Sequence, residues 1–112
     1  MSDCLFCKIV AGDIPAEIVA ESEHTIAFRD INPQAPTHVL VIPRRHEPDI
    51  ASLADAAPLE AAELLSMTRK IATDDGHDDY RLVFNNGAGA QQTVFHCHGH
   101  VVAGRDLTWP PG

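Results

Sequence analysis

Three histidines, His96, His98 and His100, alternate with other residues near the C-terminal end of this chain. The surrounding segment, 94–103, is otherwise mostly apolar and predicts a strand, on which successive side chains point to opposite faces. The three imidazoles would then share one face, with neighbouring members roughly 7 Å apart along the backbone. A lone histidine is usually a surface or packing residue, but three in strict alternation favour a functional site over a solvated face.

Two kinds of chemistry fit such a row. Histidines two residues apart on a strand, joined by a third partner, could hold a catalytic zinc ion. Alternatively, neutral imidazole is a nucleophile that titrates near neutral pH, and neighbouring imidazoles can position and protonate the group it attacks. A phosphoryl substrate suits donors of this kind. The residue types alone leave both possibilities open.

The loop before these histidines could bind a phosphate. Segment 86–93 contains Gly87, Gly89 and the hydroxyl of Thr93. Glycines allow backbone N–H groups to approach an anion, and the threonine adds a further donor. An ordinary hairpin turn has the same composition, so it is the position of this loop next to His96 that favours a phosphate site.

Cys4-x-x-Cys7 has the spacing of a zinc-binding pair. The remaining ligands would be histidines, and His46 and His96 are the candidates. The alternative is a pair of reduced thiols without a metal. A redox role is less favoured, because no strand precedes the motif as it does in thioredoxin-like proteins.

Asp30 follows Phe28 at the end of another expected strand, on the same face. A carboxylate beside an apolar slot can accept hydrogen bonds from ribose hydroxyls while the slot holds a base. The alternative is a strand-end turn aspartate, which is common.

The elements that position these residues predict an α+β fold. Strands followed by one long helix and two further strands indicate a five-stranded, mostly antiparallel sheet. Alanine and leucine at helical spacing indicate the long helix, and Gly12 ends a short N-terminal one. We expect helices at 3–10 and 51–73, a turn at 86–90, and strands at 17–21, 25–30, 38–42, 80–85 and 94–103.

Composition narrows the class of protein. The 112 residues predict a single domain over 1–112. A net charge of −8 argues against binding to nucleic acid or an anionic membrane surface, and no apolar run is long enough to span a bilayer. The first residues, 1–4, carry no signal-peptide pattern, and three cysteines do not suit a secreted disulfide framework. We therefore expect a cytoplasmic protein.

Several segments resemble the histidine triad (HIT) family. The segment 96–102, HCHGHVV, is similar to the family's triad motif, and segments 30–38 and 41–43 also match its pattern. The ending Trp109-Pro110-Pro111-Gly112 is similar to the Hint branch, the nucleoside phosphoramidases. The Cys-x-x-Cys start resembles a zinc-binding subgroup. The resemblance covers nearly the whole chain.

The resemblance implies a HIT-like fold and a homodimer whose sheet continues across the interface. It implies hydrolysis of purine nucleoside 5′-phosphoramidates, of the adenosine 5′-monophosphoramidate type, through a covalent nucleotidyl-histidine. The alternatives are a dinucleotide polyphosphate hydrolase of the same family, a zinc hydrolase that uses the triad as ligands, and a nucleotide-binding protein without catalytic activity.

The resemblance also assigns roles to residues. His98 would be the nucleophile, His100 would bond the phosphate or leaving group, and His38 would support the triad from the neighbouring strand. A structural Zn²⁺ would be held by Cys4, Cys7, His46 and His96. The nucleotide-binding residues would be Phe6, Ile9, Phe28, Asp30, Ile31, Leu40, Asn85, Thr93, His98, His100 and Trp109, with Trp109 reaching the partner's active site.

Two departures from the family pattern stand out. Gly99 occupies a position where the family usually has a bulky apolar residue, which leaves a gap on the face opposite the histidines and weakens the strand. Ala90-Gln91 replaces residues that are often glycine in relatives, so the backbone of the phosphate loop is expected to differ.

Overall fold

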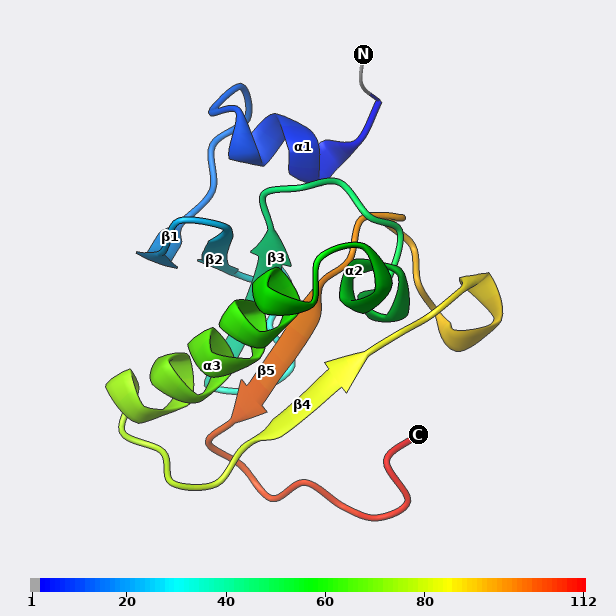
Figure 1. The fold of residues 1–112 in the computed structure, drawn as a ribbon. Helices are drawn as coiled ribbons and strands as arrows, with labels where there is room; N and C mark the ends of the chain where they lie inside the picture. Colours follow the sequence, from blue (N-terminus) through cyan, green and yellow to red (C-terminus); the bar gives the residue numbers. More distant parts are fainter. Residues whose placement is uncertain (1–2) are drawn as a thin grey trace.

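The computed structural model describes residues 3–112; Met1 and Ser2, part of the start considered for a signal peptide, lie outside the described residues. Within this range the chain forms one five-stranded antiparallel sheet with the order β1-β2-β3-β5-β4 (Figure 1). The expected α+β architecture, with a five-stranded antiparallel sheet and one long helix, is confirmed. The strands are β1 (Ile18–Glu21), β2 (Thr25–Arg29), β3 (Thr37–Pro43), β4 (Arg81–Phe84) and β5 (Gly99–Ala103).

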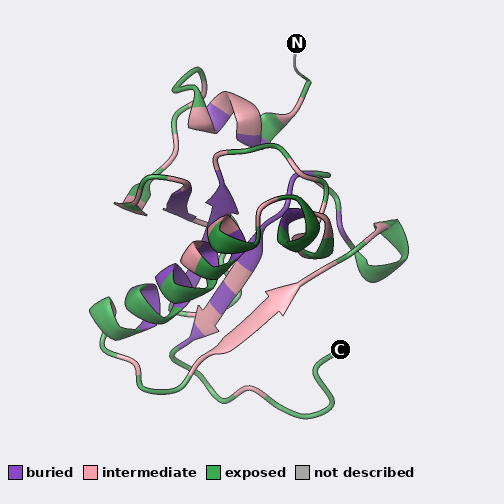
Figure 2. Ribbon diagram, viewed as in Figure 1, coloured by how far each residue is buried: buried purple, intermediate pink, exposed green. Residues whose placement is uncertain are grey.

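The helices cover both faces of the sheet. They are α1 (Leu5–Val10), α2 (Ile50–Ala56) and α3 (Pro58–Asp74), with a 3₁₀ turn, η1 (Ala88–Ala90). Side chains of α3 pack with one set of alternating strand residues, among them Val39, Val41 and Val101. Side chains of α1 pack with the opposite set, which includes Phe28 and Leu40. The two cores therefore lie on opposite faces, and β3 is buried along its whole length (Figure 2).

The prediction of one helix over 51–73 is wrong at one point. Pro58 begins α3, and Ala57 has the non-helical angles φ −150° and ψ 74°, so α2 ends before it. Proline disfavours the helical conformation in the residue that precedes it and has no N–H to continue the helix. Helix α2 has its own start, because the Asp49 carboxylate accepts a hydrogen bond from the Ser52 N–H.

The last strand is shorter than predicted. β5 begins at Gly99, so His96 and His98 lie in the segment that leads into the strand. The backbone N–H of Cys97 donates to the Glu47 carbonyl at 2.7 Å instead of joining the sheet ladder. His96 and His98 are nevertheless buried. Their imidazoles lie on the face of the sheet that carries α1, where the ring of Phe6 contacts both of them.

The remaining expected elements lie close to their predicted positions. β1, β2 and β3 match the strands expected at 17–21, 25–30 and 38–42, and β4 is half-buried as expected. The predicted turn at 86–90 contains η1, entered by Gly87 at φ +90° and left by Gln91 at φ +70°. None of the described helices is long and apolar enough to cross a membrane.

Candidate functional site

His98 is fixed in a single tautomer by the backbone. Its Nδ1 lies 2.8 Å from the His96 carbonyl oxygen, and because a carbonyl only accepts, Nδ1 carries the proton. Nε2 therefore keeps its lone pair. Burial lowers the pKa of His98, against the hydrogen bond to His96 and the charge of Asp30, which raise it. The result is a neutral imidazole with one nucleophilic nitrogen.

His100 is fixed in the opposite tautomer by a chain of hydrogen bonds. The Gln34 backbone N–H donates to Nδ1 of His38 at 3.0 Å, so the proton of neutral His38 is on Nε2. That Nε2–H donates to Nδ1 of His100 at 2.9 Å. His100 must then carry its own proton on Nε2. Burial, followed by the neighbouring His98 and His38, lowers the pKa of His100 to about 4, which keeps it neutral at pH 7.

Asp30 lies beside this chain. Its Oδ1 accepts a hydrogen bond from the Asn32 N–H at 2.8 Å, and its Oδ2 is 3.4 Å from Nε2 of His38. Ligand atoms of Asp30, His38 and His100 come within 4.8 Å of one another, as metal ligands would. A metal on Nε2 of His38 would move the proton to Nδ1, where it would face the N–H of Gln34. The donor pattern therefore favours a hydrogen-bonded chain over a metal site.

The predicted base slot is largely one apolar cluster. Phe6, Ile9, Phe28 and Leu40 are buried together on the α1 face of the sheet. The rings of Phe6 and Phe28 meet edge to face with centroids 5.6 Å apart, and Phe6 meets the His98 ring in the same way at 5.0 Å. Ile31 does not join them, because its side chain is fully exposed in the loop after β2.

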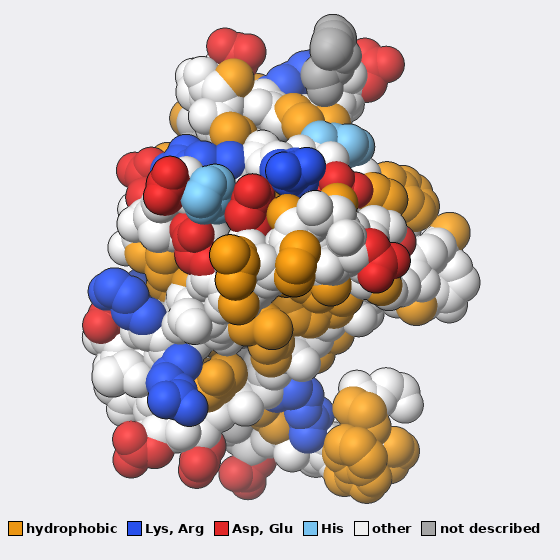
Figure 3. Space-filling model, viewed as in Figure 1, with side chains coloured by type: hydrophobic (Ala, Val, Ile, Leu, Met, Phe, Trp, Pro, Cys, Tyr) orange, Lys and Arg blue, Asp and Glu red, His pale blue; other side chains and the backbone are white. Residues whose placement is uncertain are grey.

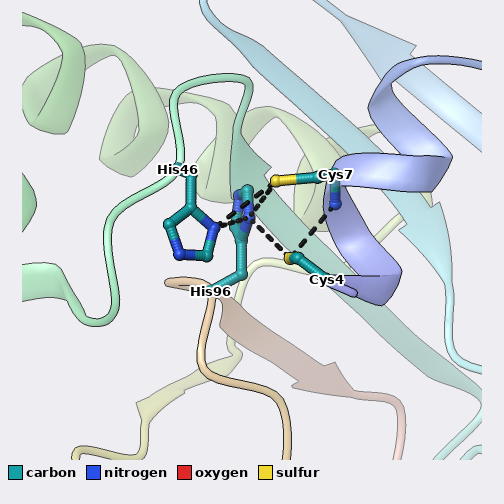
Figure 4. A group of neighbouring side chains, drawn as sticks. All are labelled: Cys4, Cys7, His46 and His96. Carbon is teal, nitrogen blue, oxygen red and sulfur yellow. Dashed lines mark hydrogen bonds between the residues drawn. The ribbon is translucent and has the colours of Figure 1, made fainter. Parts of the chain in front are cut away.

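The predicted metal ligands converge from three parts of the chain. Cys4 and Cys7 come from the start of α1, His46 from the loop after β3, and His96 from the segment before β5 (Figure 4). Nδ1 of His96 lies 3.4 Å from Sγ of Cys4, 3.6 Å from Sγ of Cys7 and 3.2 Å from Nδ1 of His46. Sγ of Cys7 lies 3.4 Å from Nδ1 of His46.

These separations fit a tetrahedral zinc centre. With Zn–S bonds of about 2.3 Å and Zn–N bonds of about 2.0 Å, a tetrahedron separates sulfur from nitrogen by roughly 3.5 Å and the two nitrogens by roughly 3.3 Å. Nε2 of His96 donates to the Pro43 carbonyl at 2.8 Å, which leaves Nδ1 unprotonated toward the cluster. Burial lowers the pKa of His96, which also favours the neutral ligand. The residues present therefore fit the ion.

The triad histidines do not share one metal. Nδ1 of His96 points into the cysteine cluster, Nδ1 of His98 donates to a carbonyl, and Nδ1 of His100 accepts from His38. Both nitrogens of His96 are thus engaged away from the other two rings, Nδ1 with the cysteine cluster and Nε2 with the Pro43 carbonyl. The alternative of a zinc hydrolase with the triad as its ligands is not what this geometry favours.

Gln92 is a site residue that the sequence did not single out. Its buried side chain accepts from the Gly87 N–H at 2.8 Å and donates to the carbonyls of Pro48 and Val94 at 2.7 and 3.0 Å. It thus holds the candidate phosphate loop in shape. Thr93, the next residue, is exposed and lines a cavity beside the cysteine cluster. A glutamine in a polar loop carries no pattern that would have indicated this role.

Asn85 and Trp109 lie at opposite ends of β4. Phe84, the last residue of β4, pairs with Gly99, so Asn85 follows at the end of β4 that is nearer to His98. Trp109 is 81% exposed, and the Arg81 guanidinium carbon lies 6.0 Å from its ring centroid. Arg81 begins β4 at the end remote from His98, so Trp109 does not join the triad of its own chain.

A family model for the HIT domain matches residues 11–107. The chain belongs to the HIT domain family. Among its relatives is an uncharacterised HIT-like protein from Synechocystis, 45% identical over 98% of this chain and 97% of the relative. A 14 kDa zinc-binding protein from Zea mays is 42% identical over 99% of this chain and 89% of that protein.

Solved structures of HIT proteins superpose closely on this fold. A HIT family hydrolase from Legionella pneumophila has a TM-score of 0.93 and 47% identity, with 98% of this chain and all of the other covered. A HIT family hydrolase from Clostridium thermocellum has a TM-score of 0.91 and 38% identity, with 96% of each chain covered.

Proposed function

We propose that this HIT protein is a hydrolase of purine nucleoside 5′-phosphoramidates that acts through a covalent intermediate on His98. The observation that carries the proposal is the hydrogen bond from Nδ1 of His98 to the His96 carbonyl, which leaves Nε2 as the nucleophile. Two similar structures are of proteins named HIT family hydrolases, which supports hydrolysis in general.

The proposed reaction has two steps. Nε2 of His98 attacks phosphorus, and the P–N bond to the amine breaks. Water then attacks phosphorus, and the P–Nε2 bond breaks to restore His98. Across both steps water supplies one proton to the amine and one hydroxyl to the nucleotide. Splitting the displacement in this way replaces one difficult step by two easier ones.

His100 and His38 would assist the first step. Nε2–H of His100 is available to donate to a phosphate oxygen or to the leaving nitrogen, which must gain a proton as it departs. His38 would act as a positioning residue, because it determines which nitrogen of His100 carries the proton. Thr93, Asn85 and the backbone of loop 86–93 would add donors around the phosphate.

The apolar cluster and Asp30 would bind the nucleoside. Phe6, Ile9, Phe28 and Leu40 would form one wall for the base, and Ile31, exposed in the loop after β2, would add an apolar contact to it. Asp30 keeps acceptor capacity beyond its bond to the Asn32 N–H and would accept the ribose hydroxyls.

Zinc would be held by Cys4, Cys7, His46 and His96, as the zinc-binding relative from Zea mays also suggests. When bound, it would supply a cross-link between α1, the loop after β3 and the triad segment. Four protein ligands leave no open position for a substrate, so the role would be structural. Because zinc needs reduced thiolates, a cytoplasmic location suits this site.

We also propose a homodimer joined along β4. Within the described residues β4 is the last strand on its side of the sheet, so its outer backbone groups can pair with a second copy. Hydrophobic side chains are exposed over the face that carries α3 and β4 and at the C-terminal tail (Figure 3). Leu65 and Trp109 are among the exposed large hydrophobic residues.

The test is a panel of adenosine and guanosine phosphoramidates and dinucleotide polyphosphates, assayed with wild type and His98→Ala. We expect turnover of the phosphoramidates by wild type, and loss of turnover in the variant with AMP binding by calorimetry largely kept, because the nucleophile acts mainly in the transition state. A phosphorus-31 spectrum of the quenched enzyme should show a phosphorus–imidazole species. Substantial turnover by His98→Ala would contradict the proposal, and a preference for dinucleotides would redirect it.

A further inference from the structure

Gly99 lies between His98 and His100, and another residue occupies the space that a side chain at position 99 would fill. The register of the sheet pairs Gly99 of β5 directly with Phe84 of β4. A Cβ atom placed on Gly99 would lie 2.8 Å from Cζ and 3.0 Å from Cε1 of Phe84, and 3.2 Å from Cδ1 of Leu82. The ring of Phe84 therefore already occupies the space that a side chain at position 99 would fill.

This contact is on the back of the strand that carries the candidate catalytic groups. Gly99, Val101 and Ala103 are buried on the α3 face, whereas His100 is on the other face and only partly buried. Phe84 packs against the same buried cluster, which includes Cys97 and Val101. Its ring thus supports the backbone between the two histidines from behind.

The support matters because glycine is the residue with the greatest backbone freedom. His98 already lies outside the sheet ladder, and Gly99 is the first residue of β5. Without packing over Gly99, the backbone on either side of it would have more freedom, and both imidazoles would move with it. Misplacement of reacting groups by even 1 Å costs rate steeply.

We propose that Phe84 is a positioning residue for His98 and His100, and that Phe84 and Gly99 form a complementary pair in which β4 supplies the packing that residue 99 lacks. The effect on turnover rests on the proposed function. The complementary sizes of Phe84 and Gly99 do not depend on the proposed function.

The experiment exchanges volume between the two positions. Phe84→Val removes as many side-chain carbons as Gly99→Leu adds, so the double variant conserves the packed volume. We compare both single variants and the double variant by thermal unfolding, AMP binding and kcat. Ile71→Ala, a cavity elsewhere in the same core cluster, is the matched control for general destabilisation. Gly99→Ala is a smaller substitution to be used if Gly99→Leu does not fold.

We expect Phe84→Val to lower Tm by roughly 5 °C or more and kcat by roughly tenfold, with AMP affinity changed less than about twofold. Gly99→Leu should lower Tm by at least as much, since the new side chain meets the ring. The double variant should regain most of both losses. Ile71→Ala should lower Tm without a comparable loss of kcat.

Imidazole resonances of His98 and His100 provide a readout independent of turnover. They should shift in Phe84→Val, return in the double variant and stay in place in Ile71→Ala. If the two Tm losses simply add in the double variant, the complementary pair is wrong. If Phe84→Val leaves both kcat and the imidazole resonances unchanged, its positioning role is wrong. If wild type has no phosphoramidase activity, the proposed function fails, and the resonances alone decide the positioning role.

Discussion

Nε2 of His38 lies 2.9 Å from Nδ1 of His100, and the Gln34 N–H behind it decides the direction of the proton between them. The His96 carbonyl fixes His98 in the opposite tautomer, with the proton on Nδ1. Two neighbouring imidazoles, with ring centroids 5.1 Å apart, are therefore held in different tautomers by the backbone. One presents a lone pair and the other a proton, which is the combination that displacement at phosphorus needs.

This arrangement predicts the tautomers directly. At pH 7 His98 should be neutral with its proton on Nδ1, and His100 neutral with its proton on Nε2. Nitrogen-15 imidazole spectra distinguish the two forms. His38→Phe should leave the His98 signals nearly unchanged, mix the tautomers of His100 and lower kcat roughly tenfold, a typical loss for a group that assists proton transfer. Identical tautomers for His98 and His100 in wild type would contradict this assignment of the two protons.

Zinc content gives a second prediction. Purified protein should contain one zinc ion per chain, and Cys4→Ser or His46→Ala should lose it and lower Tm, because binding energy at such a site is folding energy. Cys97→Ala is the matched control, since Cys97 is buried away from the cluster and should affect stability but not metal content. Metal analysis with thermal unfolding measures both. Equal zinc in Cys4→Ser and wild type would reject this ligand set.

Acid stability gives a third prediction, centred on Glu63 of α3. Hydrogen bonds from the Ser22 hydroxyl, the His24 N–H and the His24 ring lower the pKa of Glu63 to about 2. A carboxyl whose pKa is lower in the folded state stabilises the protein above its unfolded pKa, near 4.5, and this stability is lost as pH falls toward 2. Glu63→Gln should therefore cost about 1 to 2 kcal/mol at pH 6.

The difference between wild type and Glu63→Gln should shrink steadily between pH 4.5 and pH 2. Urea unfolding at several pH values measures it. Glu21→Gln is the control, because the Glu21 carboxylate is half exposed and pairs with Arg44 at the surface; it should change stability by less than about 1 kcal/mol. A difference between wild type and Glu63→Gln that does not vary with pH would show that the carboxylate charge is not the cause.

The sequence predicted the fold well because its signals are local. Alternation of apolar residues located the strands, and Gly12 ended the first helix. The prediction was wrong where contacts between residues far apart in the sequence determine the structure. The Glu47 carbonyl captures the Cys97 N–H and delays the start of β5 until Gly99. Pro58 also divides the helical pattern of 51–73, because a proline disfavours the helical conformation in the residue before it, Ala57, and the chain forms two helices in place of the one predicted.

The same distinction between local signals and long-range contacts applies to the candidate site. Residue types and spacing indicated the histidine row, the cysteine pair and Asp30. The fold brings the cysteine pair together with His46 and His96, as expected, and it places Asp30 beside His38 and His100. The groups that set the tautomers of these histidines could not be predicted from residue types. They are the Gln34 N–H and the carbonyls of His96 and Pro43, which are backbone groups common to nearly all residues. The packing of Phe84 over Gly99 depends on register between β4 and β5, which the sequence leaves open.

The C-terminal tail gives the last prediction. Arg81 Nη2 donates to the Leu107 carbonyl at 3.5 Å, so a truncation after Leu107 keeps this anchor and removes residues 108–112 only. Trp109 is exposed on a segment with two prolines, which stiffen it and lower the entropy lost on docking.

If the tail reaches a partner's active site, it contacts the leaving amine more than the nucleotide. The truncated protein, and Trp109→Ala with it, should then show changed ratios of kcat/KM between amines of different size, while AMP affinity changes less than about twofold. Kinetics on several phosphoramidates, with light scattering to verify the dimer, measure this. A truncated protein that remains dimeric and keeps every ratio would rule out a role for the tail in substrate selection, and would leave Trp109 as a packing residue against Arg81.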